Sequence, residues 1–328
     1  MATESESSRS ATRRYSPTYW VENMTDEQFA YFMLLPAFAL VGAFALWPLW
    51  ETFQMSLHAD NLTGSGYVGE FVGIENYVAI LTGEMTALLG APFFDLDQPL
   101  QSALSVTLIY TAISVTLELI VGFGMALILD KEFYGRRWVR VAILVPWAVP
   151  IAIQGMIFYL IFLPSVGFGT QAMHAIGLFS DTPFINSADL LIMVIIADVW
   201  KTSAFIALIV LAGLQSIDRE LYRVGRVAGA SAWQRFRYIT FPLVVPTLLV
   251  ALLFRTIQSM RIFGIIRTIG GSGGCSTLPS LSCLVVTTFQ GSGRYATAAA
   301  LAFITAVVVA IVAGIYIVGF ADVEGGAI

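Results

Sequence analysis

Six long apolar runs are the feature that most constrains this chain. They cover approximately residues 29–50, 103–129, 138–163, 189–214, 242–263 and 296–320. A helix needs about 20 mostly apolar residues to cross the hydrocarbon core of a bilayer, so each run is long enough to span it. Charged residues make up 12% of the chain, against about 25% in soluble domains. The sequence therefore predicts an all-α integral membrane protein with six transmembrane helices.

The runs divide the chain into a short tail and one membrane domain. Residues 1–28 are rich in Ser, Thr and Glu, which is typical of a disordered tail, and residues 29–328 form the domain. Thr25 and Gln28 have the spacing of a capping box, which predicts the start of a helix. No small-residue cleavage site follows the first run, so we interpret it as an uncleaved anchor.

The basic residues predict the orientation. With both termini in the cytoplasm, the outer loops hold only Arg267 and Arg294. The inner segments then hold 12 of the 17 basic residues: Arg9, Arg13, Arg14, Lys131, Arg136, Arg137, Arg140, Arg219, Arg223, Arg226, Arg235 and Arg237. Cytoplasmic loops carry an excess of Lys and Arg, so this distribution indicates a multi-pass protein of the cell membrane in that orientation.

The first outer loop is acidic. From His58 to Pro99 it carries Asp60, Glu70, Glu75, Glu84, Asp95 and Asp97 and no basic residue, and the whole chain has a net charge of −5 with only two Lys. Two interpretations remain open. The acidic surface is either an adaptation to a halophilic host or a docking surface for an external partner.

Cys275 and Cys283 are the only cysteines, and both lie in the last outer loop. An oxidising exterior permits a disulfide between them, and two free thiols are the alternative. Without nearby His they predict no metal site.

The sequence lacks the motifs of several function classes. It contains no G-x-x-x-x-G-K-[ST] motif, so the chain is not expected to bind ATP by a P-loop. His58 and His174 have no metal-ligand spacing, and no nucleophile with a base or paired carboxylates stands out. We therefore expect no catalysis of a covalent step, no cofactor bound by this chain and no nucleic-acid partner.

A basic, amphipathic segment interrupts the apolar pattern between the fourth and fifth runs. Asp218 is placed to cap a first short helix, and Gly229 to allow a bend before a second. Apolar residues then recur at three- or four-residue intervals: Val227, Ala230, Trp233, Phe236 and Ile239. The segment either lies on the inner face of the membrane or inserts into a groove of another protein.

This segment resembles the cytoplasmic coupling motif of permeases of binding-protein-dependent ABC importers, E-A-A-x-x-x-G-A followed by W-Q-x-F-x-x-I-x-x-P. The matching residues are Gly229, Ala230, Trp233, Gln234, Phe236, Ile239 and Pro242. The segment departs from the motif at four positions. Arg223 replaces the Glu, Val224 and Gly225 replace the two Ala, and Ala228 replaces the Asp that often precedes the Gly. The stretches 136–150, 198–218 and 254–274 also resemble the carbohydrate-uptake branch, with departures at Ala204 and Gly264.

The resemblance implies a sugar importer assembled from several subunits. It implies a second homologous permease, a dimer of subunits that bind ATP and Mg, and an external solute-binding protein. The residues implied to contact the ATPase are Arg223, Gly229, Ala230, Trp233, Gln234 and Phe236. Because Arg223 reverses the charge at the position of the Glu, the ATPase is expected to present an acidic residue there.

Polar residues inside the predicted spans suggest a solute pathway, since buried charge in a membrane is costly. The candidates are Gln154, Asp198, Trp200, Lys201, Gln258 and Ser259. Asp198 and Lys201 are three residues apart on one helix face, so they could pair with each other. The alternative to a solute pathway is a set of interhelical pairs that only holds the bundle together. Trp147 and Phe158 are expected to face lipid or packing neighbours.

Other transported solutes and another class of transporter remain open. Glycerol phosphate or another polyol-like solute is the alternative to a sugar. An ATP-independent secondary transporter is the alternative from a different class, although the sequence has no clear internal repeat and only Glu118 and Asp198 as deep carboxylates.

Overall fold

The computed structural model describes residues 24–62 and 68–325, and the side chains as far as residue 318. Most of the chain is helical, and it divides into two units, Met1–Met55 and Ser56–Ile328. Five helical segments of the described residues are long and apolar enough to cross a membrane, or six if one broken pair counts as a span. The predicted tail, apart from residues 24–28, lies outside the described residues.

The first unit contains the first predicted span. It forms α3 (Asp26–Val41), a π-helical turn (Gly42–Leu46) and most of α4 (Trp47–Ser56). Thr25 and Gln28 form the predicted capping box, in which each side chain accepts a hydrogen bond from the other's backbone amide.

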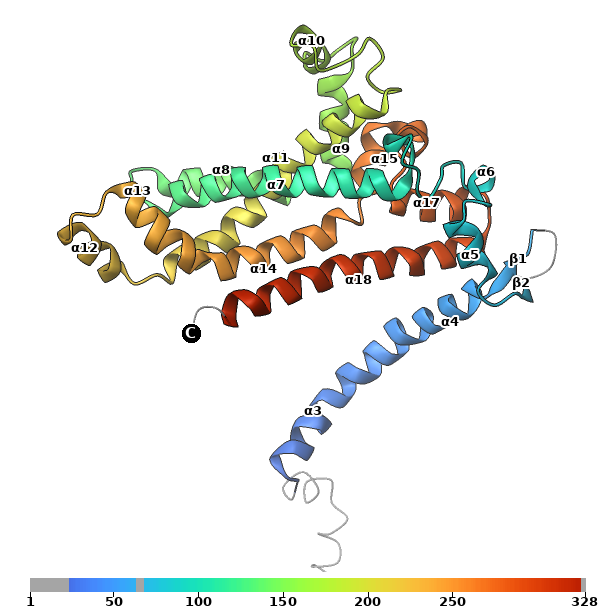
Figure 1. Ribbon diagram of the computed structural model, residues 1–328, viewed down its shortest axis with the longest axis horizontal. Coiled ribbons are helices and arrows are strands. Elements are labelled where there is room, and N and C mark those ends of the chain that lie inside the picture. The colour runs from blue at the N-terminus through green and yellow to red at the C-terminus, as the bar shows by residue number, and fades with distance from the viewer. Residues whose placement is uncertain (1–23, 63–67, 326–328) are drawn as a thin grey trace, which may run out of the picture. The chain divides into compact units, whose positions relative to one another are not determined.

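Four long helices form the second unit (Figure 1): α7 (Ala103–Asp130), α11 (Ser187–Gln215), α14 (Phe241–Ser259) and α18 (Tyr295–Gly325). Helix α11 packs against α7 and α14, and α14 packs against α18. Gly122 allows a close approach of α7 and α11, because a Cβ there would lie 2.7 Å from the Ser203 carbonyl oxygen. Such small residues let membrane helices pack closely without a hydrophobic driving force.

The third predicted span is broken. Instead of one helix over 138–163, the structure has α8 (Arg136–Ala148) and α9 (Ile151–Phe162), bent by 95°. The bend lies at Val149 and Pro150, both extended. Pro150 has no amide hydrogen and disfavours a helical conformation for the residue before it, so the helix ends there.

The fifth predicted span has different bounds. Its helix begins at Ala232 with α13 (Ala232–Arg235), passes through a π-helical turn (Phe236–Thr240) and ends at Ser259 rather than at residue 263. The next amides, of Arg261 and Ile262, make tighter turn bonds to Gln258 and Ser259. Beyond the helix end, the carbonyl oxygen of Ile262 accepts a bond from the Ser280 hydroxyl, which ties this turn to another segment of the chain.

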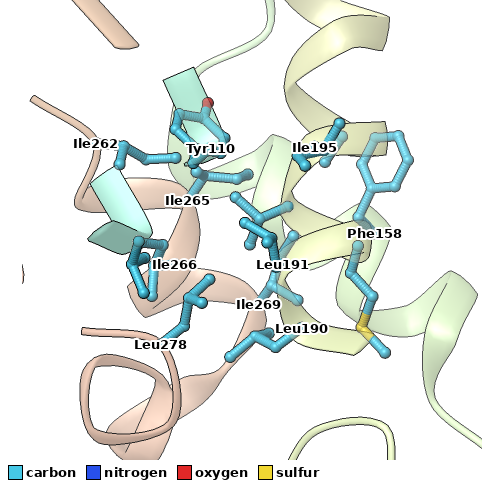
Figure 2. Packing of buried hydrophobic residues seen from close by; sticks show 14 of the residues in the cluster. Tyr110, Phe158, Leu190, Leu191, Ile195, Ile262, Ile265, Ile266, Ile269 and Leu278 are labelled. Carbon is cyan, nitrogen blue, oxygen red and sulfur yellow. The ribbon is translucent and has the colours of Figure 1, made fainter. Parts of the chain in front are cut away.

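The predicted last outer loop is a folded cap. It contains α15 (Gly264–Ile269), a 3₁₀ turn (Gly271–Gly273), α16 (Gly274–Thr277), α17 (Leu281–Val286) and a π-helical turn (Thr287–Gly291). Figure 2 shows Ile265, Ile266 and Ile269 of α15 packed toward Leu190 and Leu191 of α11. Cys275 and Cys283 form a disulfide with a Cα–Cα distance of 5.4 Å, and both are buried in this cap.

Short elements complete the same end of the second unit. Strands β1 (His58–Asp60) and β2 (Val68–Phe71) pair antiparallel, followed by α5 (Glu75–Leu81), α6 (Thr86–Leu89) and a 3₁₀ turn (Pro99–Gln101). Helix α10 (Gly169–Ala175) follows α9. Asp60 accepts bonds from the amides of Ala296 and Thr297, so this member of the acidic loop caps α18.

Candidate functional site

A cavity of about 310 Å³ opens between α7, α8, α9, α11, α14 and α15. Five of the six predicted solute-pathway residues line it: Gln154, Asp198, Lys201, Gln258 and Ser259. Trp200 is not in the lining, since its ring packs edge-on against Phe158 at 5.5 Å and is 40% exposed. The remaining lining residues include Tyr110, Trp147, Thr202, Arg255, Arg261 and Ile262.

A buried ionic network forms one wall of the cavity and joins three helices. The guanidinium of Arg255 on α14 donates from Nε and Nη2 to both carboxylate oxygens of Glu118 on α7, the Nη2 bond being 2.8 Å. Nη2 also donates to Asp198 on α11, which accepts a further bond from the Tyr110 hydroxyl. Ser114 donates to Glu118 at 2.8 Å. Two carboxylates therefore share one guanidinium, and its fork geometry fixes the three helices relative to one another.

Asp198 and Lys201 do not form the ion pair that their spacing allows, whereas interhelical ion pairs do occur. Asp198 pairs with Arg255, whereas the Lys201 ammonium donates to the carbonyl oxygen of Val149 at 2.5 Å. That carbonyl lies at the bend between α8 and α9, where no helical amide can bond to it. Gln154 on α9 makes a second tie, donating to the Ala197 carbonyl of α11 at 2.7 Å. Both residues thus hold the broken helix against α11 at the edge of the cavity.

Ser259 and Arg261 in the lining have polar atoms that other groups of the described residues do not occupy. Ser259 is 1% exposed, and its hydroxyl has no hydrogen-bond partner in the described part of the chain. Arg261 makes no ion pair among the described residues. Trp147, expected to face lipid or packing neighbours, lines the cavity, while Phe158 is buried in the core as expected.

The sequence identifies Glu118 as a deep carboxylate without assigning it to the site, and Tyr110, Arg255 and Arg261 were not among the predicted site residues. Glu118 and Arg255 are 137 residues apart, so no spacing within one helix relates them. In the sequence, each stands out only as a charged residue inside an apolar run. Burying a charge in a membrane is energetically unfavourable, so such a residue is expected to have an ion partner, but the sequence does not identify that partner.

The predicted coupling segment forms two short helices at one end of the bundle. Helix α12 (Arg219–Val227) is capped by Asp218, which accepts a bond from the Glu220 amide at 2.9 Å. Gly229 then adopts φ +81°, a conformation that favours glycine, and α13 follows. The expected apolar pattern over 227–239 is therefore split by a turn rather than carried on one continuous helix.

Several residues of the coupling motif have roles within the chain. Gln234 and Ser231 form a capping box at the start of α13. Phe236 packs against Phe123 of α7 at 6.0 Å and stacks on Trp233 at 5.4 Å. The Ala230 carbonyl accepts a bond from Arg235 at 2.6 Å. Trp233 remains 68% exposed and is the large apolar side chain of this group that a partner can cover.

Charge pairs fix the start of α12 to the end of α7. Arg219 donates two bonds, of 3.1 and 2.7 Å, to the carboxylate of Asp130, and these bonds raise the pKa of Arg219 above its usual value. Arg223 forms an exposed ion pair with Glu220 on the same helix. An acidic residue of a partner would have to compete with Glu220 for Arg223.

No group of three or more His, Cys, Asp or Glu side chains that could hold a metal ion occurs within residues 24–62 and 68–325. The side chains that line the cavity offer a solute hydrogen bonds, the cations Lys201, Arg255 and Arg261, and aromatic rings.

Comparison with known proteins agrees with this architecture. Residues 118–321 match the family described as binding-protein-dependent transport system inner membrane component. The trehalose/maltose transport system permease protein MalF of Thermococcus litoralis is 34% identical over 288 residues, which cover 87% of this chain and 90% of the relative. The trehalose transport system permease protein SugA of Mycobacterium tuberculosis is 32% identical, covering 84% of this chain and 82% of the relative.

A solved structure shares the fold. One chain in the crystal structure of a bacterial ABC transporter involved in the import of the acidic polysaccharide alginate superposes with a TM-score of 0.72, covering 90% of this chain and 95% of that chain at 22% identity. Taken with the family match over most of the second unit, these relatives show that the chain is a multi-pass membrane protein belonging to the family of binding-protein-dependent transport system inner membrane components.

Proposed function

We propose that the chain is the membrane-spanning permease subunit of an ATP-driven importer for a sugar such as trehalose or maltose. The family match and the names of two relatives above 30% identity support this proposal. The observation that carries it is the cavity, whose wall presents the unpartnered Ser259 hydroxyl and a guanidinium held in place by two carboxylates. Sugar hydroxyls are both donors and acceptors, so they match such a set of groups.

The subunit would work in a complex. ATP and Mg would bind to a dimer of ATPase subunits, and a second homologous permease would complete the pathway through the membrane. An external solute-binding protein would deliver the solute to the end that carries the disulfide cap. The exposed Trp233 and the α12 residue Val224, 65% exposed, would contact the ATPase, because large apolar side chains dominate interface energies.

We propose that α12 and both chain termini are cytoplasmic, and the charges at the two ends of the second unit support this location for α12. Basic side chains gather around α12 and α13, including Arg219, Arg223, Arg226, Arg235 and Arg237. The opposite end carries Glu70, Glu75 and Glu84 near β2 and α5. Positive charge is enriched on the cytoplasmic side of membrane proteins.

The test is purification of the tagged chain from its host in mild detergent, followed by analysis of co-purifying subunits and ATP hydrolysis. We expect a second permease and an ATPase whose hydrolysis is stimulated by a trehalose-loaded binding protein. Trp233→Ala should reduce recovery of the ATPase, and the neighbouring Tyr238→Ala, also exposed, is the matched control. A chain that moves trehalose across liposomes without ATP would instead identify a secondary transporter.

Glycerol phosphate is the second candidate solute, and one observation favours it. Lys201 and Arg261 line the cavity and form no ion pair within the described part of the chain, so they offer positive charge to an anionic group. Competition distinguishes the two candidates: excess glycerol phosphate should leave uptake of labelled trehalose unchanged if the solute is a neutral sugar. Strong inhibition would favour the phosphorylated solute.

A further inference from the structure

A second cavity, of about 430 Å³, lies at the α12 end of the bundle, outside the site described above. Its lining consists almost entirely of cationic side chains: Lys131, Arg219, Arg223, Arg226 and Arg235, together with Tyr222. We name this cavity the basic hollow. Three residues, Arg219, Arg223 and Arg226, reach it from one face of α12, since they are four and three residues apart.

Carboxylates neutralise only part of this charge. Asp130 holds Arg219, and Glu220 holds Arg223. Glu132 is the third carboxylate of this region and, after Asp130, the second that acts on Arg219. Arg235 donates a hydrogen bond from Nη1 to the Ala230 carbonyl oxygen, and this uncharged group does not neutralise the charge of Arg235. Lys131 and Arg226 form no ion pair among the described residues, so five cations face three carboxylates.

The length of α7 is consistent with a position of the basic hollow among lipid headgroups. Lys131 directly follows the last residue of α7, and Arg219 comes four residues after the end of α11. Helix α7 has 28 residues, so at 1.5 Å per residue it is roughly 42 Å long, about the thickness of a bilayer including its headgroups. When a helix of this length crosses the bilayer, the side chains just beyond its end meet phosphate groups rather than acyl chains.

The face of α12 that lines the basic hollow is not its apolar face. Leu221 and Val224, which are 44% and 65% exposed, lie away from the Arg219–Arg223–Arg226 face. A protein partner can cover this apolar face and leave the basic hollow accessible from the membrane.

We infer that the basic hollow binds the phosphate headgroup of an anionic phospholipid. Arg guanidinium groups match phosphate oxygens bidentately, and several of them converge on one cavity. Basic pockets between helices on the inner face of membrane proteins bind acidic headgroups in this way. The inference depends on the protein being a membrane protein, but not on the proposed transport function or solute.

The experiment measures lipid retention by the full-length chain. The purified protein is equilibrated with phosphatidylcholine and phosphatidylglycerol, and bound lipids are counted by native mass spectrometry. We expect preferential retention of phosphatidylglycerol, weakened about fivefold for each cation removed by Lys131→Gln or Arg226→Gln. Arg226→Lys, which keeps the charge, should retain most of the binding.

The matched control is Arg237→Gln, which removes one positive charge from the same segment outside the lining of the basic hollow. It should retain phosphatidylglycerol like the unmodified chain. Equal retention by all variants would overturn the inference. Displacement of the lipid by inorganic phosphate at equal affinity would also overturn it, because the ligand would then be a soluble anion. Loss of the lipid on assembly with the ATPase would overturn it as well, because the ligand would then be an acidic side chain of that protein. Because no transport is measured, a failed importer assay leaves this result unaffected.

Discussion

At the scale of residues, one buried network decides how the three central helices meet. Glu118 is fully buried, Arg255 is 4% exposed, and Asp198 is shared between Arg255 and Tyr110. Removing one partner of a buried pair leaves an uncompensated charge, which is far more costly than the pair itself is stabilising. The residues of the network are therefore not interchangeable, because two carboxylates share one cation.

Substitutions in the network should follow a fixed order. Arg255→Met leaves two carboxylates without a cation and should lower the free energy of unfolding by about 3–5 kcal/mol. Glu118→Gln should cost less, and Asp198→Asn least, because the forked Glu118–Arg255 pair remains. Chemical unfolding in detergent measures the series, with the exposed Glu220→Gln as a control that should cost less than about 1 kcal/mol. A larger cost for Asp198→Asn than for Arg255→Met would contradict the assignment.

Replacing Ser259 should increase the stability of the protein and weaken its function. Its hydroxyl is buried and has no hydrogen-bond partner among the residues that the structure describes, so Ser259→Ala should raise the free energy of unfolding by about 1 kcal/mol. The same change should raise KM for trehalose uptake several-fold if the hydroxyl meets the solute. Ser203→Ala is the control, because its hydroxyl is bonded to Val199 within its own helix. Unchanged KM together with increased stability would remove Ser259 from the solute site.

At the scale of elements, the bend between α8 and α9 depends on contacts from α11. Proline ends α8, but the direction of α9 also depends on the ties made by Lys201 and Gln154. A lysine inside a span, which by sequence is a candidate for solute contact, thus also satisfies a carbonyl that the broken helix leaves free.

Replacing Lys201 tests this role. Lys201→Met should cost roughly 1.5–3 kcal/mol of unfolding free energy, the value of a hydrogen bond from a charged group. Spin labels on Trp138→Cys and Leu160→Cys, in a background without Cys275 and Cys283, should report a broader distance distribution across the bend. Lys201→Arg retains a donor and should restore the narrow distribution. An unchanged distribution in Lys201→Met would show that Pro150 alone fixes the bend.

The disulfide stabilises the cap formed by α15, α16 and α17. It joins residues eight apart in sequence, so the loss of loop entropy in the unfolded chain contributes roughly 2–3 kcal/mol. The double variant Cys275→Ser with Cys283→Ser should lose about this amount in chemical unfolding. Reductant should lower the stability of the unmodified protein and not that of the double variant. Equal stability of the reduced and oxidised proteins would contradict a stabilising role.

At the scale of the whole molecule, charge is divided between the two ends of the second unit. The basic α12 end and the acidic β2 and α5 end predict opposite sides of the membrane. Five cations at the α12 end also line the basic hollow. The same basic side chains that indicate the orientation of the protein therefore also form the proposed lipid headgroup site.

Cysteine labelling in intact cells tests the orientation. The two native cysteines are first replaced by Ser, which leaves a chain without cysteine. Glu70→Cys should then react with a membrane-impermeant maleimide, and Arg237→Cys should react only after the membrane is permeabilised. Both positions are exposed, so accessibility to water does not separate them. The reverse pattern of labelling would invert the topology.

The sequence by itself determined the membrane class, the family and most of the long helices, because apolar runs and capping residues act locally. The ranges 103–129 and 189–214 differ from α7 and α11 by at most two residues at either end. The tertiary structure decided the ion partners, the bend and the folded cap. Asp198 pairs with Arg255 rather than with the nearby Lys201, because helix packing brings residues 57 apart into contact and satisfies a buried charge there. Charge complementarity of this kind depends on distance in space, which spacing along one helix cannot provide.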